Sequence, residues 1–162
     1  MEGAKIEGVA HPASVIVISS GLVLSTNLAA AQSAKDLVGA WTLVSADAFG
    51  ANPRGTVIFE PNGRFAAMLM RADLAKYASN NRAQGTAAEN KATVEGSIAY
   101  FGTYSVSGTD VNFHIEGSTF PNWAGSDQKR INLAITGDEL KWVQPTPSAG
   151  GPPTPVVWRR VK

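Results

Sequence analysis

From residue 41 onward, apolar and polar side chains alternate in short runs separated by turn-forming residues. This alternation is typical of β-strands that bury one face. Pro61 and Gly63 supply the residues that a tight hairpin requires between two of these runs. The pattern predicts eight strands, approximately at residues 41–46, 56–59, 65–70, 99–106, 111–117, 128–135, 140–144 and 156–161.

Two stretches interrupt this rhythm. Residues 72–97 are rich in alanine and have no β-branched run, which predicts a short helical insertion between the third and fourth strands. Residues 145–155 contain five prolines and cannot form a strand. Strands never alternate regularly with helices, so we expect an all-β, antiparallel, up-and-down barrel whose interior can hold one small ligand. A β-sandwich is the alternative architecture.

The first 31 residues have a different character. Lys5 precedes an uncharged stretch over residues 13–31, which is most apolar at residues 15–24 and ends in three alanines. This order is typical of a secretory signal peptide cleaved before Gln32. We therefore expect a periplasmic or secreted protein whose domain spans residues 32–162, with no membrane span left after cleavage. A membrane anchor is the alternative, but the apolar run is short for a span of about 20 residues.

Composition excludes several classes of function. The chain has no cysteine, which excludes disulfides and thiol nucleophiles, and its two histidines leave little room for a metal centre. A formal net charge of +1 gives no basic surface for nucleic acid. The glycine-containing segment at residues 102–104 lacks the pattern of a phosphate-binding loop. We expect no metal, no cofactor and no nucleic-acid partner.

The motifs along the chain resemble a known family. Gly39-Ala40-Trp41 resembles the G-x-W signature of lipocalins, and further segments are similar to the bacterial and fungal lipocalin-like domain family: residues 37–41, 59–64, 100–104, 116–123, 137–140 and 157–161, together with Arg130. The resemblance implies a lipocalin-type barrel, a small apolar ligand, and Trp41 closing one end beneath Arg159 or Arg160. We place Arg159 in that role. The resemblance implies no particular reaction.

Several side chains are candidates for contact with a ligand. Tyr100 and Tyr104 share one strand face, a spacing that suits either core packing or a pocket wall with the hydroxyls as polar groups, and Met68 suits an adaptable apolar wall. Phe120 and Trp123 lie in a loop, where two large aromatic side chains must pack either over one barrel end or against a ligand. We expect all five to contact an apolar ligand.

Two charged or titratable side chains leave alternatives open. His114 and Glu116 share a strand face and would make a general base with its orienting carboxylate, yet the same alternation favours a solvent-facing position for both. Arg130 alternates with the apolar Ile131 and is expected to point outward; if it points inward, it would anchor a carboxylate or enolate. We count both His114 and Arg130 among the candidate ligand contacts.

The sequence therefore predicts an exported protein that holds a small hydrophobic molecule in a barrel cavity. The first alternative is a barrel enzyme, namely a cyclase, isomerase or hydrolase, that acts on a hydrophobic substrate with His114 as its general base. The second is a structural or interaction module, for which the barrel would be filled by Trp41, Phe113 and other side chains and would hold no cavity.

Overall fold

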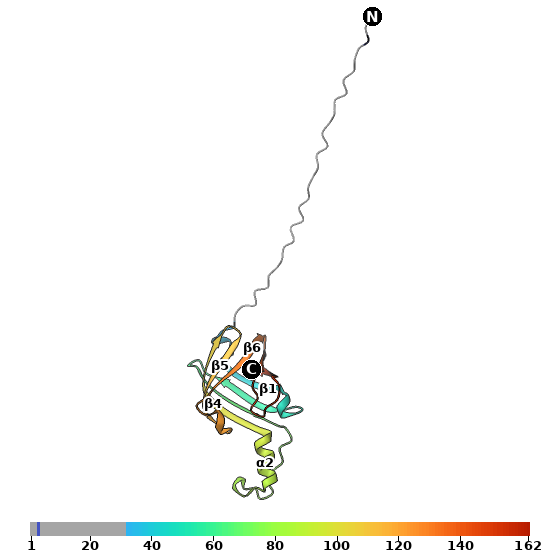
Figure 1. Cartoon of the computed structure of the whole chain (residues 1–162), viewed down its shortest axis with the longest axis vertical. Coiled ribbons are helices and arrows are strands. Elements are labelled where there is room, and N and C mark those ends of the chain that lie inside the picture. The colour runs from blue at the N-terminus through green and yellow to red at the C-terminus, as the bar shows by residue number, and fades with distance from the viewer. Residues whose placement is uncertain (1–2, 4–31) are drawn as a thin grey trace.

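The computed structural model describes Gly3 and residues 32–162, so the expected signal peptide lies outside the described residues. The described chain forms one closed barrel (Figure 1). Its eight antiparallel strands follow each other in sequence order, and β8 pairs back with β1. This confirms the predicted up-and-down architecture. The strands are β1 (Gly39–Ala46), β2 (Arg54–Phe59), β3 (Arg64–Met70), β4 (Ser97–Ser107), β5 (Asp110–Ser118), β6 (Asp127–Thr136), β7 (Glu139–Gln144) and β8 (Thr154–Arg160).

The predicted helical insertion is α2 (Ala87–Gly96), which projects beyond one end of the barrel (Figure 1). A capping box starts this helix, because Thr86 and Glu89 each bond the backbone N–H of the other. Glu89 also accepts a hydrogen bond of 2.8 Å from the N–H of Ala78. The backbone bonds from Ala78 and Thr86 lower the pKa of Glu89. One carboxylate thus fastens the segment before the helix to its first turn.

Short helical turns complete the fold. They are α1 (Ala34–Leu37), η1 (Asp47–Phe49), η2 (Arg82–Gln84) and η3 (Pro121–Trp123). α1 precedes β1 at one end of the barrel, while η1 follows β1 at the opposite end. The two barrel ends are therefore covered by different segments.

One half of the barrel is filled by aromatic side chains. The rings of Phe65 and Phe113 lie 4.5 Å apart, and those of Phe59 and Tyr104 lie 4.8 Å apart, both in edge-to-face contact. Trp142, 3% exposed, extends the cluster. Buried rings that contact one another therefore occupy this half of the barrel.

The same half is closed by Trp41 and Arg160. Nε1 of Trp41 donates a hydrogen bond of 2.8 Å to the carbonyl of Leu37, and Cζ of Arg160 lies 4.0 Å from the centre of the Trp41 ring. Arg160 donates further bonds to the carbonyls of Val38 and Asp36, at 2.9 and 2.7 Å. We call this the closed end. The assignment of this role to Arg159 is wrong, because consecutive strand residues face opposite sides and Arg159 is exposed.

A β-bulge in β6 corrects another expectation. The pairing register with β7 shifts between Ile131 and Ala134, and Asn132 has a positive φ of 58°. The bulge changes the side-chain parity, so Arg130 and Leu133 are both buried although an odd number of steps separates them. Arg130 therefore points into the barrel, whereas uninterrupted alternation had placed it outside.

Candidate functional site

The end of the barrel opposite Trp41 holds a cavity of about 720 Å³. This volume lies within the range of about 300–1,000 Å³ that is usual for small-molecule sites. We call this the open end. Its inner wall comes from six of the eight strands together with η3 and is mainly apolar; the buried side chains that line it are Ala46, Leu69, Ile98, Tyr100, Trp123, Arg130, Gln144 and Val156.

Arg130 is the basic side chain of this wall, and it is 1% exposed. Nη1 donates to the carbonyl of Lys129 at 2.9 Å, and Nη2 donates to the hydroxyl of Tyr100 at 3.3 Å. Within the described chain, no carboxylate forms an ion pair with Arg130. A guanidinium has five N–H donors, so these two bonds leave part of its donor capacity unused.

Aromatic rings surround the guanidinium. Its Cζ lies 5.4 Å from the ring centre of Phe113, 5.7 Å from that of Trp123 and 6.0 Å from that of Tyr100. The rings of Tyr100 and Trp123 meet edge to face at 5.3 Å. Cation–π attraction offsets part of the cost of burying this charge, and the rings hold the side chain in place.

Two further polar groups reach the cavity wall. Because the hydroxyl of Tyr100 accepts a bond from Arg130, its own proton is free to be donated to another acceptor. Gln144, 8% exposed, donates through Nε2 to the carbonyl of Thr146 at 2.8 Å, and this bond orients its amide. The wall thus combines an apolar surface with a few fixed polar groups, as is typical of ligand sites.

The rim of the cavity is built from loops and short helices. η1 contributes Asp47 and Phe49, and α2 contributes Val94 and Glu95. Val94 is 77% exposed although it is apolar. The proline-rich connection between β7 and β8 lines the remaining side. Asp47 and Glu95 are both exposed, so the carboxylates of this site lie at its entrance and not beside Arg130.

The structure brings four of the candidate ligand contacts together at the cavity, namely Tyr100, Phe120, Trp123 and Arg130. The loop of η3 packs Trp123 against Tyr100 and Phe120, at 5.3 and 6.1 Å between ring centres. That these side chains touch a ligand stays a prediction.

Two other candidates lie elsewhere. Tyr104 is buried in the filled half, where its hydroxyl donates to the carbonyl of Glu60 at 3.1 Å. Burial, followed by the nearby charge of Glu60, raises the pKa of Tyr104. Met68 is 45% exposed on the outer wall, because it alternates with the inward-facing Ala67 and Leu69. Neither residue lines the cavity.

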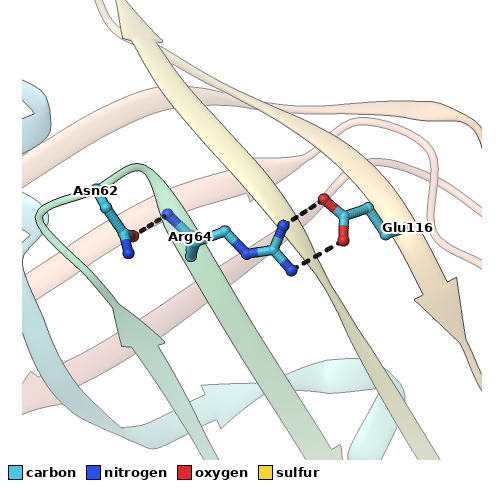
Figure 2. Close-up of polar contacts among 3 residues, drawn as sticks. All are labelled: Asn62, Arg64 and Glu116. Atoms are coloured by element: carbon cyan, nitrogen blue, oxygen red, sulfur yellow. Dashed lines mark hydrogen bonds and ion pairs between the residues drawn. The ribbon is translucent and has the colours of Figure 1, made fainter.

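His114 also lies on the outer wall, which removes it from the candidate site. Its Nδ1 is 2.8 Å from Oδ1 of Asp127, and both side chains are exposed. Glu116 does not orient the imidazole, because its carboxylate forms a bidentate ion pair with Arg64 across β4 (Figure 2). The backbone N–H of Arg64 is in turn bonded to Oδ1 of Asn62 at 3.0 Å. Of the two alternatives for His114, the structure therefore shows the solvent-facing position that alternation favoured, and not the pairing with Glu116.

Sequence reasoning missed several cavity residues. Gln144 shares its strand face with Leu140 and Trp142, so alternation alone would have indicated an inward position. Phe49 and Val94 had no such signal, because they lie outside the strands and reach the cavity only through the positions of η1 and α2.

Comparison with known proteins agrees with this architecture. The family model described as "Lipocalin-like domain" matches residues 38–161, which is most of the chain. No curated protein matches the sequence. In the described part of the chain, no helix has the length and apolar character needed to cross a membrane. The eight-stranded closed barrel and the extent of this match show that the chain belongs to the family of lipocalin-like domains.

Proposed function

We propose that this protein is exported and binds a small apolar molecule in the cavity at the open end of the barrel. The observation that carries the proposed binding is the cavity itself, which is lined mainly by buried apolar side chains and lies in a barrel whose other half is filled; the proposed export rests on the sequence of the first 31 residues alone. A rigid scaffold that leaves such a space open is expected to gain free energy when an apolar ligand displaces water from it.

Burial of apolar ligand surface supplies the driving force. Covering about 300 Å² of such surface at roughly 25 cal/mol per Å² contributes about 7 kcal/mol. The loss of translational and rotational freedom opposes binding by several kcal/mol. We therefore expect weak affinity for an apolar probe without polar groups, with Kd values in the high micromolar to millimolar range.

The enzyme alternative lacks support at this cavity. His114, its expected general base, lies on the outer wall and is paired with Asp127. A general base must reach the proton that it abstracts, directly or through one water molecule. An imidazole outside the barrel cannot do so for a substrate inside it.

A pair of matched substitutions tests where an apolar molecule binds. Ala46 points into the cavity and Ala66 lies exposed on the outer face of β3. We expect Ala46→Phe to reduce the affinity for the neutral fluorescent probe N-phenyl-1-naphthylamine at least tenfold, because the added ring occupies the site. Ala66→Phe should bind the probe as wild type does. Near-ultraviolet circular dichroism should confirm that both variants fold.

Unchanged probe affinity in folded Ala46→Phe would refute the proposed site. Native mass spectrometry, compared with the same sample after denaturing extraction, would supply the mass of any molecule that copurifies. Export is tested separately, by N-terminal sequencing of the protein recovered outside the cytoplasm. We expect Gln32 as the first residue, and an intact N-terminus at Met1 would refute cleavage at this site.

A further inference from the structure

We infer that the ligand of this cavity is a monoanionic amphiphile, an apolar molecule with one carboxylate that is bound by Arg130 and Tyr100. The inference rests on the proposed function and adds the chemical class of the ligand. Its basis is a charged side chain in the deep wall that has no partner of opposite charge in the described chain.

The burial of Arg130 is costly in the free protein. The guanidinium of Arg130 is a charged group, and the residue is only 1% exposed. Buried charges are usually paired with an opposite charge. The two hydrogen bonds that Arg130 donates go to neutral oxygens, the carbonyl of Lys129 and the hydroxyl of Tyr100. The site therefore holds a positive charge whose counter-ion the described protein does not supply.

Tyr100 makes the arrangement selective for an anion. Its hydroxyl accepts a bond from Nη2 of Arg130, so its own proton remains available for donation to a ligand. Arg130 and Tyr100 together present N–H and O–H donors from adjacent positions. A carboxylate, which accepts at both oxygens, matches such a pair and forms charge-assisted bonds with it.

The remaining charges limit the ligand to one negative group. Arg130 is the basic residue of the cavity lining, while the two acidic residues, Asp47 and Glu95, lie exposed at the rim. A second anionic group on the ligand would meet no cation inside and would lie near these carboxylates as it entered. Trp123, Phe120 and the aliphatic wall residues then surround the body of the ligand, which must be apolar.

The test compares acids with alcohols of the same skeleton. The probe pairs are octanoate with 1-octanol and 1-naphthylacetate with 2-(1-naphthyl)ethanol. Binding of each probe to the full chain, which contains the 32–162 domain, is measured by isothermal titration calorimetry at pH 7. For wild type we expect each acid to bind about 10- to 100-fold more tightly than its alcohol, as charge-assisted hydrogen bonds in a buried site imply.

Substitutions test which residues cause the preference for acids over alcohols. Arg130→Met should abolish the preference for the acid and leave alcohol binding within about threefold of wild type. Tyr100→Phe should weaken acid binding severalfold. Lys129→Met is the matched control, because it removes one positive charge from the neighbouring position, where Lys129 points outward and pairs with Asp110 at 3.0 Å. We expect this control to retain the full preference.

The outcomes separate the two proposals. Equal binding of acid and alcohol by wild type would overturn the carboxylate inference and leave apolar binding intact. A preference that persists in Arg130→Met, or that is lost equally in Lys129→Met, would overturn the role of Arg130. Failure of both members of both pairs to bind folded wild type would overturn the proposed function and this inference together.

The wild-type comparison does not depend on how well Arg130→Met folds. Arg130→Lys provides a further check, because it keeps the charge and removes the planar donor pair. We expect this variant to bind acids with intermediate affinity. Binding of acids by Arg130→Lys as weakly as by Arg130→Met would show that charge alone contributes nothing, against the inference.

Discussion

Replacement of Arg160 by methionine tests the physical account of the closed end. Methionine keeps much of the aliphatic length of arginine but removes the guanidinium that lies 4.0 Å above the Trp41 ring. It also removes the donors to the carbonyls of Val38 and Asp36. These contacts join the last strand to the segment that precedes the first, so their loss should loosen the closure of the barrel.

The expected loss in the free energy of unfolding depends on how exposed each of these contacts is. A hydrogen bond from a charged donor contributes about 1.5–3 kcal/mol when desolvated. We take the lower value for the half-buried bond to Val38 and a small fraction for the exposed bond to Asp36. The cation–π contact adds about 0.5–1 kcal/mol. Arg160→Met should therefore lower the free energy of unfolding by about 2–3 kcal/mol, which corresponds to roughly 6–12 °C in Tm for a domain of this size.

Urea and thermal unfolding, followed by circular dichroism and tryptophan fluorescence, measure this difference. Arg159→Met is the matched control, because Arg159 is adjacent in sequence, exposed and pointed away from Trp41. The control should stay within about 0.5 kcal/mol of wild type. If Arg160→Met is no less stable than Arg159→Met, the closing role assigned to Arg160 is refuted.

Three further predictions concern the backbone and one tyrosine. Gly102→Ala should cost about 3 kcal/mol or more in thermal unfolding, because a Cβ there would lie 1.9 Å from the carbonyl oxygen of His114; a near-neutral effect would contradict this packing. Asn132→Gly should leave stability nearly unchanged, whereas Asn132→Val should cost about 1–2 kcal/mol, since the positive φ of the bulge suits no β-branched residue; equal stabilities would argue against the bulge. Burial raises the pKa of Tyr104, so its contribution to the free energy of unfolding is fully present below the usual tyrosine pKa of about 10 and is lost as pH rises above it. Tyr104→Phe should therefore reduce the fall of the unfolding free energy with rising alkaline pH, measured by urea unfolding. An unchanged fall would assign the pH dependence to other groups.

The order and direction of the strands could be predicted because their signals are local. Alternation over a few residues marks each strand, and Pro61 with Gly63 marks a tight turn, so neither requires knowledge of distant parts of the chain. The alternation of β8 also indicates which arginine closes the barrel. Arg160 shares its strand face with the buried Trp158, whereas Arg159 does not, and the assignment to Arg159 did not follow that rule.

The same rule explains why His114 and Met68 were misplaced as ligand contacts. His114 lies between the buried Phe113 and Ile115, and alternation favoured its outward position from the start. The chemistry of both side chains suits ligand contact, but the backbone pleat directs both of them outward. Chemical suitability does not place a side chain inside a barrel.

Local patterns determine the strands, their sequential pairing and the family to which the chain belongs. Tertiary structure alone decides that Arg130 faces inward, because a bulge at Asn132 arises from the pairing of β6 with β7 and leaves little trace in local periodicity. It also decides that one half of the barrel is filled by aromatic rings while the other keeps a cavity of about 720 Å³. Such a cavity is the space left where side chains from strands far apart in sequence fail to meet, and that depends on the closure of all eight strands at once.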